Sequence, residues 1–596
     1  MVSTLKKPAP KRNNITVLTD FSKISWRRAE KIMISFRNDH DISSEAQAVT
    51  IIKENPYTLC DVKGIGFKTA DYIALFDLDL SADNPSRHLY GNRYLLHTNN
   101  NNGVMPLKEY RDSRRKLGLL NPDLEQEGVT FESGRVWDAE EYKAEITLSS
   151  FFKSLGKLNT HCSYGNVVDE RLKSYGCNEE QREAVHLALS GKPLMGLTGG
   201  AGTGKSFTIA SIAKEALKAN KKVAAMAFSG KAADRVAEAL EEADVSSPML
   251  ITGTIHKTLG LYEGITLSEV SEDKELYSED GELDTQKRLD ADIIILDEAS
   301  MIHNWLLACV IQAKKPDATI ILVGDPAQLP PVGHGNPFVS FIEQGMPVVN
   351  LEENYRQKDE QDIFLLGTGI LKEEPYQPES SAINLTFSNS GWGLVKQTIE
   401  TIKEQNLLDW QVVTWTNKVK EQANKDIQEL LNPYGEPTIE YISGGYVNGR
   451  YEKTTIKIGD KVLVRSNDYT YNVFNGQIGI LESVSRNSEN ELCVDVRING
   501  FLAKIPFAAA EDLFQLGYCI TCHKSQGSGW NHVILYQPFG VSLKALPKRF
   551  YYTAITRAKN KLDVFSGLDK NAFWTNATQL PYIGETTLSK RIKGVL

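Results

Sequence analysis

Hydrophobic and polar residues alternate along the chain with the periods of two kinds of element. From about residue 180, short apolar runs are separated by amphipathic stretches with helical spacing. This alternation predicts strand–helix–strand units and a parallel sheet covered by helices on both faces. In chain order the predicted elements are the strand LMGLT (194–198), the helix FTIASIAKEALK (207–218), and the strands VAAMAF (223–228), IIIL (293–296) and TIILVG (319–324).

A second block of the same kind is expected to begin near residue 348. Between 431 and 515 it is interrupted by short strands and turns, including the alternating run VDVRI at 494–498. We interpret this interruption as a small β-barrel inserted into the second α/β domain. The predicted strands of the second block are VVNL (348–351), VVTW (412–415), HVILY (532–536) and LDVF (562–565).

The region before the first strand has a different pattern of hydrophobic and polar residues. Residues 15–160 predict amphipathic helices, as in SWRRAEKIMISF (25–36), and residues 1–14 predict a flexible basic tail. The expected organisation is therefore a helical N-terminal domain, two α/β domains and the inserted barrel. The predicted units are 1–14, 15–160, 161–345 for the first α/β domain, 346–430 and 516–596 for the second, and 431–515 for the barrel.

Composition excludes several classes of protein. With 41% hydrophobic and 24% charged residues the chain is ordinary globular protein, and no apolar run is long enough for a membrane span. Its seven cysteines are too few to form a disulfide scaffold in 596 residues, and the N-terminus lacks the apolar core of a signal peptide. We therefore expect a cytoplasmic protein with no membrane partner.

The net charge of −9 is unevenly distributed. Residues 261–292 hold eleven acidic and three basic side chains, whereas residues 1–37 hold nine basic and two acidic ones. A polyanion responds to local charge rather than to the sum, so the overall charge does not exclude a nucleic-acid partner. Each run is equally compatible with a solvated face or tail.

A phosphate-binding motif lies between the first predicted strand and the helix after it. GGAGTGKS fits G-x-x-x-x-G-K-[ST] at every fixed position. Glycines let backbone N–H groups close around phosphate oxygens, the lysine would reach the β- and γ-phosphates, and the Ser206 hydroxyl would bind Mg²⁺. The predicted nucleotide-binding residues are Gly199, Gly200, Ala201, Gly202, Thr203, Gly204, Lys205 and Ser206.

Two carboxylates that could complete this site follow the run IIIL. In IIILDEAS, Asp297 would hold the metal and Glu298 would act as general base on the attacking water. Alone, this pair also fits a surface turn, but about ninety residues after a phosphate loop it favours catalysis. Gln328, in GDPAQLPPV (324–332), lies near the end of the next strand, where its amide could sense a γ-phosphate.

The second block offers two arginines for the same chemistry. Arg356 stands in NYRQ (354–357) and Arg557 in AITRAK (554–559). Because both are distant in sequence from the phosphate loop, they suggest side chains that reach across a domain interface to the transition-state charge. For either arginine alone, a surface salt bridge is the alternative.

In this order the motifs resemble those of superfamily 1 helicases, and within them the RecD-like group, which also includes the phage Dda helicases. The resemblance runs from about residue 178 to 570 and implies two RecA-like P-loop motor domains of α/β class, with ATP and Mg²⁺ as cofactors. NEEQREAV (178–185) resembles the Q motif, which implies that Gln181 reads adenine. NDYTYNVFNGQIG (467–479) resembles the RecD-like NDY…VFNGDIG signature, which implies an SH3-like insert.

The resemblance also implies contacts to single-stranded DNA. SGKAADRV (229–236), TIHKTLG (254–260) and TCHKSQGS (521–528) resemble motifs that carry such contacts in this family. The implied DNA-binding residues are Lys231, Thr254, His256, Asn417, His523, Lys524 and Ser525.

The N-terminal part carries a weaker signal of the same kind. NPYTLCDVKGIGFKTADYIA (55–74) resembles the helix-hairpin-helix region that precedes the motor in longer RecD-like helicases. Its turn from Gly64 to Gly66 and the following Lys68 would present N–H groups and a charge to a DNA phosphate without reading bases. A plain helical hairpin used only for packing is the alternative.

Two segments depart from the family pattern. The acidic stretch 261–292 stands where the family carries a small hairpin that splits the duplex, and acidic side chains would repel phosphate, so a wedge function is open. CITCH (519–523) matches a haem-attachment pattern, but its histidine coincides with the HKSQG motif. We interpret Cys519 and Cys522 as strand residues.

The function implied by the resemblance is an ATP-dependent DNA helicase that moves 5′ to 3′ on single-stranded DNA. Its expected partners are single-stranded DNA and junctions with duplex, together with replication or repair proteins, and a monomer is expected. Two alternatives share the motor motifs: a DNA-stimulated ATPase that remodels protein–DNA complexes, and an RNA-directed helicase.

Overall fold

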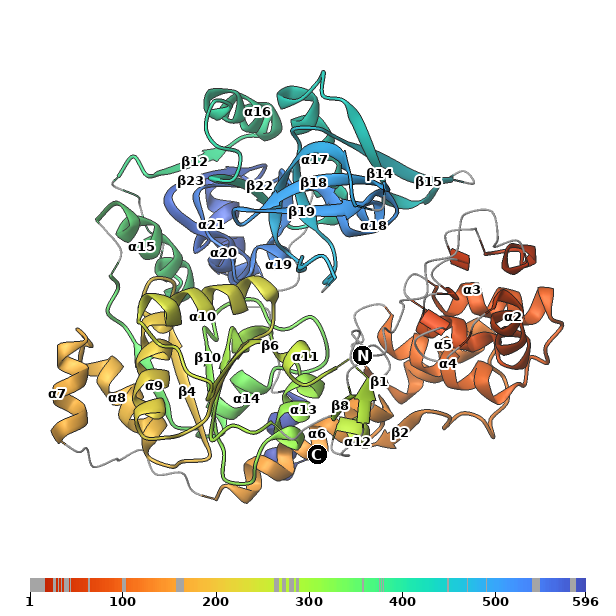
Figure 1. The fold of residues 1–596 in the computed structure, drawn as a ribbon, viewed down its shortest axis with the longest axis horizontal. Helices are drawn as coiled ribbons and strands as arrows, with labels where there is room; N and C mark the ends of the chain where they lie inside the picture. The colour runs from red at the N-terminus through yellow and green to blue at the C-terminus, as the bar shows by residue number, and fades with distance from the viewer. Residues whose placement is uncertain are drawn as a thin grey trace.

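In the computed structural model, two helix-covered parallel sheets stand next to each other, with a helical N-terminal part to one side (Figure 1). In the part of the chain that the structure describes, no helix is long and apolar enough to cross a membrane. The predicted basic tail, 1–14, lies outside this part. The described residues are 17–24, 28–29, 32–33, 35–36, 42, 44–62, 65–98, 103–156, 166–261, 267–270, 275–277, 283–285, 289–355, 358–374, 376, 378, 380–447, 450–468, 470–488, 490–538, 547–578 and 586–595.

The first sheet has six parallel strands in the order β11-β4-β10-β9-β5-β6. VVNL, expected to open the second block, is strand β11 and pairs with β4. That prediction is wrong, because the chain leaves the first sheet only after this strand. The strands are β4 (Leu194–Gly199), β5 (Val223–Ala227), β6 (Leu250–Thr254), β9 (Ile293–Asp297), β10 (Thr319–Gly324) and β11 (Val348–Leu351).

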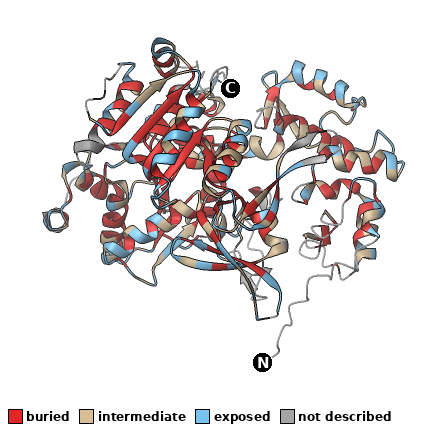
Figure 2. Cartoon of the chain, turned by 90° about the horizontal axis from the view of Figure 1, so that it is seen from above, coloured by how far each residue is buried: buried red, intermediate tan, exposed pale blue. Residues whose placement is uncertain are grey.

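Alternate residues of these strands pack on opposite faces, as the period of two in a strand requires. Met195 and Ile295 face α8 (Glu179–Leu189), α9 (Lys205–Lys218) and α10 (Gly230–Glu242). Ile294 and Leu296 face α13 (Asn304–Ala313) and α14 (Pro337–Glu343). Because both faces are covered, the inner strands β4, β5, β9 and β10 are buried along their length, whereas the edge strands β6 and β11 are partly exposed. Figure 2, coloured by burial, shows strands of the protein that are buried along their length.

The second sheet has five parallel strands in the order β12-β23-β22-β13-β21. Its strands are β12 (Ile383–Phe387), β13 (Trp410–Thr414), β21 (Cys519–Thr521), β22 (Trp530–Gln537) and β23 (Ala558–Ser566). On one face lie α16 (Gly391–Ile402) and α17 (Asn417–Leu431), and on the other α15 (Lys358–Lys372), α20 (Pro547–Ile555) and α21 (Lys570–Thr578). The predicted α/β class with two parallel sheets is confirmed.

An all-β segment interrupts the second sheet between β13 and β21, at the position expected from the sequence. Its antiparallel sheet has the order β19-β18-β17-β16-β20, and a long hairpin, β14 with β15, precedes it. The segment shares one core with the second sheet, since Val462 and Leu516 pack in the same cluster as Trp410. The elements are β14 (Pro437–Val447), β15 (Arg450–Lys457), β16 (Lys461–Val464), β17 (Ile478–Arg486), β18 (Leu492–Ile498), β19 (Phe501–Pro506), α18 (Phe507–Leu513) and β20 (Phe514–Leu516).

The N-terminal part is helical up to residue 98 and then forms a small sheet. Its helices surround a core in which Tyr57 stacks on Phe67 and Tyr90. The antiparallel sheet that follows has the order β1-β3-β2. The elements are η1 (Leu18–Asp20), α2 (Glu45–Glu54), η2 (Pro56–Asp61), α3 (Phe67–Tyr72), η3 (Ile73–Asp77), α4 (Pro85–His97), β1 (Val104–Pro106), α5 (Leu107–Leu117), β2 (Val129–Glu132) and β3 (Arg135–Asp138).

Helix α6 (Ala139–Ser154) belongs to the first α/β domain although the sequence assigned it to the N-terminal one. Its residues Ala144, Leu148 and Phe152 lie in the core cluster that contains α13 and the lower face of the first sheet. Phe152 stacks on Phe341 of α14 at a centroid distance of 4.9 Å. The physical boundary therefore lies before α6 rather than near residue 160.

The last helix, α22 (Thr587–Lys593), returns to the first α/β domain and packs on α6 and α14. Arg591 forms ion pairs with Glu132 and with the fully buried Glu145, whose Oε1 lies 3.3 Å from Arg591 Nε. Glu145 also accepts hydrogen bonds from Thr587 (2.9 Å) and Asn304 (3.4 Å). Sequence position had assigned this helix to the second domain.

The acidic stretch is described only in pieces. Helix α12 (Leu267–Val270) is followed by strands β7 (Glu275–Tyr277) and β8 (Leu283–Thr285), which pair antiparallel. The backbone N–H of Leu267 donates to Glu140 Oε2 at 2.7 Å, which ties α12 to α6. The remainder of the stretch between 262 and 288 lies outside the described residues.

Candidate active site between the two sheets

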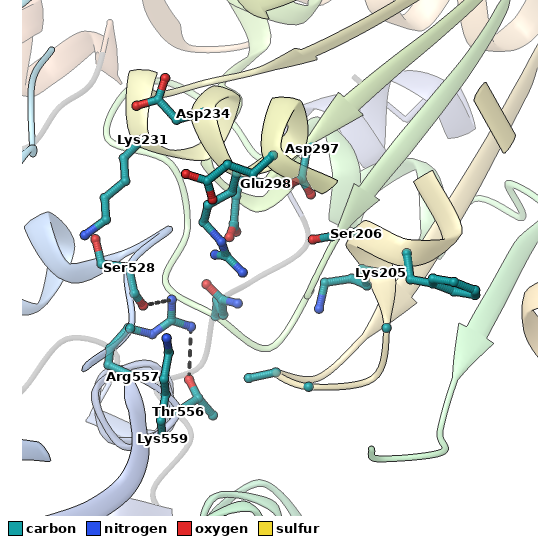
Figure 3. Close-up of a pocket in the computed structure, with 18 of the residues that line it drawn as sticks. Lys205, Ser206, Lys231, Asp234, Asp297, Glu298, Ser528, Thr556, Arg557 and Lys559 are labelled. Atoms are coloured by element: carbon teal, nitrogen blue, oxygen red, sulfur yellow. Dashed lines mark hydrogen bonds between the residues drawn. The ribbon is translucent and has the colours of Figure 1, made fainter. Parts of the chain in front are cut away.

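A cavity of about 690 Å³ opens between the two parallel sheets. The phosphate loop and the end of β9 contribute to one side, and the segments before β22 and around the start of β23 contribute to the other (Figure 3). It therefore brings together chemistry that lies more than three hundred residues apart in the sequence. Its lining includes Lys205, Ser206, Lys231, Asp234, Arg235, Asp297, Glu298, Gln328, Ser528, Thr556, Arg557 and Lys559.

The predicted phosphate loop runs from the end of β4 to the first turn of α9. Gly202 and Gly204 have left-handed backbone conformations, with φ of 85° and 83°. A Cβ at Gly204 would also stand 2.6 Å from Gln181 Nε2, so glycine is needed there for space as well as for conformation. Lys205 Nζ donates to the carbonyls of Gly199 and Gly200, each at 2.7 Å. Gly202, Gly204 and Lys205 all line the cavity, so the turn and its cation form part of the cavity wall.

The charge on Lys205 is set by opposing effects. Burial lowers the pKa of Lys205, and the nearby carboxylates of Asp325, Glu298 and Asp297 act against that shift. An ammonium group surrounded by carboxylates on one side and open to the cavity on the other is suited to attract a polyanion.

The two predicted carboxylates stand where β9 ends. Asp297 is its last residue, and Glu298 follows with a left-handed φ of 52°. Burial raises the pKa of Asp297, and the Glu298 carboxylate raises it further. The left-handed backbone of Glu298 is strained, and strain of this kind in a non-glycine residue at a cavity is typical of functional sites. Asp297 and Ser206 line the same cavity, and their carboxylate and hydroxyl oxygens are the hard ligands that Mg²⁺ prefers (Figure 3).

Gln328 lies in the loop after β10 and lines the cavity. Its Oε1 is buried and has no hydrogen-bond partner among the described residues. A buried amide oxygen without a partner is costly, which favours a ligand or water that supplies a donor. The loop itself is folded by Asp325, whose Oδ1 accepts from Ala327 N at 3.0 Å and whose carbonyl accepts from Gln328 N at 3.2 Å.

Arg557 reaches the cavity from the second domain, just before β23. Its guanidinium donates to the carbonyls of Thr553 (3.0 Å) and Ser528 (3.1 Å) and to the Thr556 hydroxyl (3.1 Å) (Figure 3). These bonds hold a buried cation at the cavity wall opposite the phosphate loop. The other predicted arginine, Arg356, lies outside the described residues.

Gln181, predicted to read adenine, is a capping residue in this structure. Its backbone N–H donates to Asn178 Oδ1 at 2.8 Å and its Oε1 accepts from Asn178 N at 3.1 Å, which forms a capping box at the start of α8. Gln181 does not line the cavity, but its Nε2 faces Gly204 of the phosphate loop.

The predicted DNA contacts of the first domain separate into two places. Lys231 lines the nucleotide-side cavity, where its Nζ lies 5.0 Å from the centroid of the Trp530 ring and burial lowers its pKa to about 8. Thr254 caps α11 (Ile255–Thr258) by accepting from Lys257 N at 3.2 Å. The ring of His256 packs edge-on against Phe228 at 6.1 Å, and burial lowers its pKa.

The predicted DNA contacts of the second domain lie around α19 (Cys522–Ser525) and the start of α17. His523 packs against Trp415 at 5.6 Å, and Lys524 Nζ donates to Asn475 of the insert at 2.5 Å. Ser525 is fully buried and donates to the Cys522 carbonyl at 2.7 Å, so its hydroxyl does not face solvent. Asn417 is exposed and lines a second cavity of about 980 Å³.

The helix-hairpin-helix residues lie in the N-terminal part, away from both cavities. Gly66 caps α3 and is exposed, and Lys68 is exposed with its Nζ 5.9 Å from the Tyr94 ring. Gly64 lies outside the described residues.

Sequence reasoning missed several residues at the domain interface. Arg235 lines the cavity and its Nη1 donates to the Gly527 carbonyl of the second domain at 3.3 Å. Tyr552 donates to Asp325, and Gln477 of the insert donates to Asp234 at 3.2 Å. Arg235 stands in the motif SGKAADRV and Tyr552 lies two residues before AITRAK, but only the fold brings their partners together.

Family models of known proteins match three successive parts of the chain. Residues 12–105 match the family model described as the ATP-dependent RecD2 DNA helicase HHH domain, 176–366 an AAA domain, and 516–564 the UvrD-like helicase C-terminal domain. The ATP-dependent RecD2 DNA helicase of Deinococcus radiodurans is 27% identical over 590 residues, covering 92% of this chain and 74% of that protein. The RecBCD enzyme subunit RecD of Mycolicibacterium smegmatis is 27% identical over 443 residues, covering 67% and 73%. A solved structure of Pif1 helicase from Candida albicans gives a TM-score of 0.45 at 17% identity, covering 70% of this chain and 99% of that one.

Proposed function

We propose that this chain, a RecD2-like superfamily 1 helicase, hydrolyses ATP in the cavity between its sheets and thereby moves 5′ to 3′ along single-stranded DNA, opening duplex ahead of it. The observation that carries this proposal is the convergence of Lys205, Glu298 and Arg557, from both α/β domains, on one cavity. A site shared between two domains can change shape when its ligand changes, which is what a motor requires.

Each residue of the cavity has a proposed role. Lys205 binds the β- and γ-phosphates, Glu298 takes a proton from the attacking water, Gln328 orients that water, and Arg557 stabilises the developing charge. Arg356 has the same proposed role as Arg557. Ser206 and Asp297 would hold Mg²⁺, which supplies charge neutralisation at the phosphate oxygens.

Binding of the nucleotide base is proposed for the edge of the phosphate loop. Gln181 stands beside Gly204 there, and we assign its Nε2 to adenine while its Oε1 keeps the cap. The neighbouring Tyr355 donates its backbone N–H to the Gly202 carbonyl at 3.1 Å and is half exposed.

Movement requires two grips on the strand that shift relative to each other. We propose His256 and Thr254 on the first domain and Asn417, His523 and Lys524 on the second. Ser525 supports the second grip from within the protein, since its hydroxyl donates to the Cys522 carbonyl inside α19. Lys231 acts between the domains, because its ammonium stands in the nucleotide-side cavity.

The accessory parts have proposed roles as well. We assign the all-β insert to the SH3-like class and the N-terminal part, through Gly64, Gly66 and Lys68, to duplex backbone contacts near a junction. A cytoplasmic monomer that works with replication or repair proteins completes the proposal. The family match over residues 12–105 supports the N-terminal assignment.

The test is ATP hydrolysis by Lys205→Ala with and without single-stranded DNA. The variant is expected to fold, because Lys205 bonds only two loop carbonyls, and to lose hydrolysis. A folded variant that hydrolyses ATP at the wild-type rate would show that ATP is not hydrolysed at this cavity.

A further inference from the structure

The loop that carries Gln328 is bonded to the second domain at several points. Tyr552 Oη donates to Asp325 Oδ2 at 2.6 Å, Arg549 Nη1 donates to the Gln328 carbonyl at 3.3 Å, and Leu329 N donates to Thr553 Oγ1 at 3.0 Å. All three partners are residues of α20. These bonds tie the loop to α20, although the loop follows a strand of the first sheet.

A fourth bond to the loop comes from a different segment. Gln526 Nε2 donates to the Leu329 carbonyl at 3.1 Å, and both groups are buried. Gln526 is the C-cap residue of α19 and follows directly after Ser525. Leu329 is the neighbour of Gln328, whose unpartnered Oε1 lines the nucleotide cavity. One amide thus connects the helix that carries the proposed DNA grip with the residue beside the proposed water-orienting group.

This connection is short enough to carry a displacement. Helix α19 has only four residues, and its C-cap Gln526 stands two residues after Lys524. Leu329 is fully buried, and both its N–H and its carbonyl are bonded to the second domain. Packed interiors transmit such shifts rather than absorbing them.

We propose that Gln526 is a positioning residue through which single-stranded DNA bound at α19 sets the place of Gln328 in the nucleotide cavity. The proposal rests on the proposed function, because it needs DNA at α19. In thermodynamic terms Gln526 carries part of the coupling free energy between the DNA site and the ATP site. It touches neither ligand.

The experiment compares Gln526→Ala and Gln526→Glu with the wild type in the full chain. Steady-state ATP hydrolysis is measured without DNA and with saturating oligo(dT), and oligo(dT) affinity is measured by fluorescence anisotropy. The expected result is DNA-free turnover within about twofold of wild type, unchanged affinity, and DNA-stimulated turnover lower by about tenfold. Gln526→Glu should show the same loss, because an ionised carboxylate cannot donate to the Leu329 carbonyl.

The matched control is Asn576→Ala in α21, where an amide donates only to the Ala572 carbonyl of its own helix. It should keep full DNA stimulation. Wild-type stimulation in both Gln526 variants would overturn the proposal, as would a weakened oligo(dT) affinity, since Gln526 would then be a DNA contact. A wild-type protein whose hydrolysis does not respond to single-stranded DNA would overturn the proposed function together with this inference.

Discussion

Tyr552 Oη lies 2.6 Å from Asp325 Oδ2, and this hydrogen bond joins α20 of the second domain to the loop after β10 of the first. The same hydroxyl lies 3.5 Å from the point where a Cβ on Gly200 would stand, next to the phosphate loop. Asp325 in turn is the carboxylate that most supports the charge of Lys205 against burial. The Tyr552 hydroxyl therefore bonds to the loop that carries Gln328 and also lies close to the phosphate loop.

Replacing this phenol tests whether the contact serves catalysis. Tyr552→Phe removes one hydroxyl and keeps the ring, so Asp325 loses a donor without a cavity being formed. We expect kcat for ATP to fall by about fivefold to tenfold and KM to change by less than about twofold, because the loop positions groups rather than binding nucleotide. Tyr434→Phe, at a tyrosine that is 97% exposed, is the control and should leave kcat unchanged. An unchanged kcat in Tyr552→Phe would assign the bond to stability alone.

The general-base assignment predicts a separation of binding from chemistry. Glu298→Gln should lower ATP turnover by at least about a hundredfold while nucleotide binding is retained or tighter, since a charge beside the phosphates is removed. Glu238→Gln changes a carboxylate of the same cavity that has no proposed role and should alter turnover by less than about threefold. Turnover and fluorescent-nucleotide affinity measure the two quantities. Equal effects of the two substitutions would contradict the assignment.

The C-terminal helix is predicted to stabilise the first motor domain. Arg591→Ala leaves Glu145, which is fully buried, without its cationic partner, and breaking such a pair costs about 3–5 kcal/mol. We expect the transition of the first domain to move to lower urea concentration. Lys590→Ala, on the same helix and outside this ion-pair network, should shift it little. A wild-type urea midpoint in Arg591→Ala would show that α22 is only loosely attached.

Deletions locate the boundary of the N-terminal part. Removing residues 1–84 takes away the core around Tyr57 but keeps α4 through α6, so the motor should fold and hydrolyse ATP. Removing residues 1–160 also takes away Leu148 and Phe152, which lie in the core of the first sheet, each worth about 1.5–3 kcal/mol of burial. That deletion should unfold the first domain, as circular dichroism and protease resistance would show. A folded motor after the longer deletion would place α6 outside the core.

His303 gives a pH dependence of stability. Burial lowers its pKa to about 4, with smaller contributions from His256 and His334. In the unfolded chain the imidazole binds a proton near pH 6.5, so the free energy of unfolding falls as pH drops from there toward 4. His303→Leu should reduce this loss by roughly 1–2 kcal/mol at pH 5. The measurement is the urea midpoint of the wild type and of His303→Leu at pH 7 and pH 5. An equal loss of stability between these pH values in both proteins would exclude His303 as the cause.

The sequence predicted the parts of the site better than their assembly. The strand and helix on either side of the phosphate loop were predicted because local periodicity dictates them, and the all-β insert was predicted from its alternation. The strand at 348–351 was assigned to the wrong sheet because apolar runs do not encode which neighbour they pair with. Helix α22 and α6 were misplaced for the same reason, since Arg591 and Glu145 are 446 residues apart.

Some side-chain positions could be predicted from the sequence and others could not. The motifs predicted one shared site, and the structure brings its residues to one cavity: Lys205, Asp297, Glu298, Gln328 and Arg557. The spacing could not indicate that Ser525 is buried or that Lys231 faces the nucleotide side, because both depend on how segments distant in sequence pack together in the fold. The bonds of Tyr552 and Gln526 to the Gln328 loop likewise exist only once the two sheets stand together.

The most direct test of the central claim is ATP-driven opening of two duplexes that differ only in carrying a 5′ or a 3′ single-stranded tail. Strand separation is followed by release of a fluorophore from a quencher, with Lys205→Ala as the inactive control. The account predicts that wild-type protein opens the 5′-tailed duplex and not the 3′-tailed one. Opening of the 3′-tailed duplex alone would contradict the direction, and opening of neither, with hydrolysis still stimulated by single-stranded DNA, would contradict the helicase assignment itself.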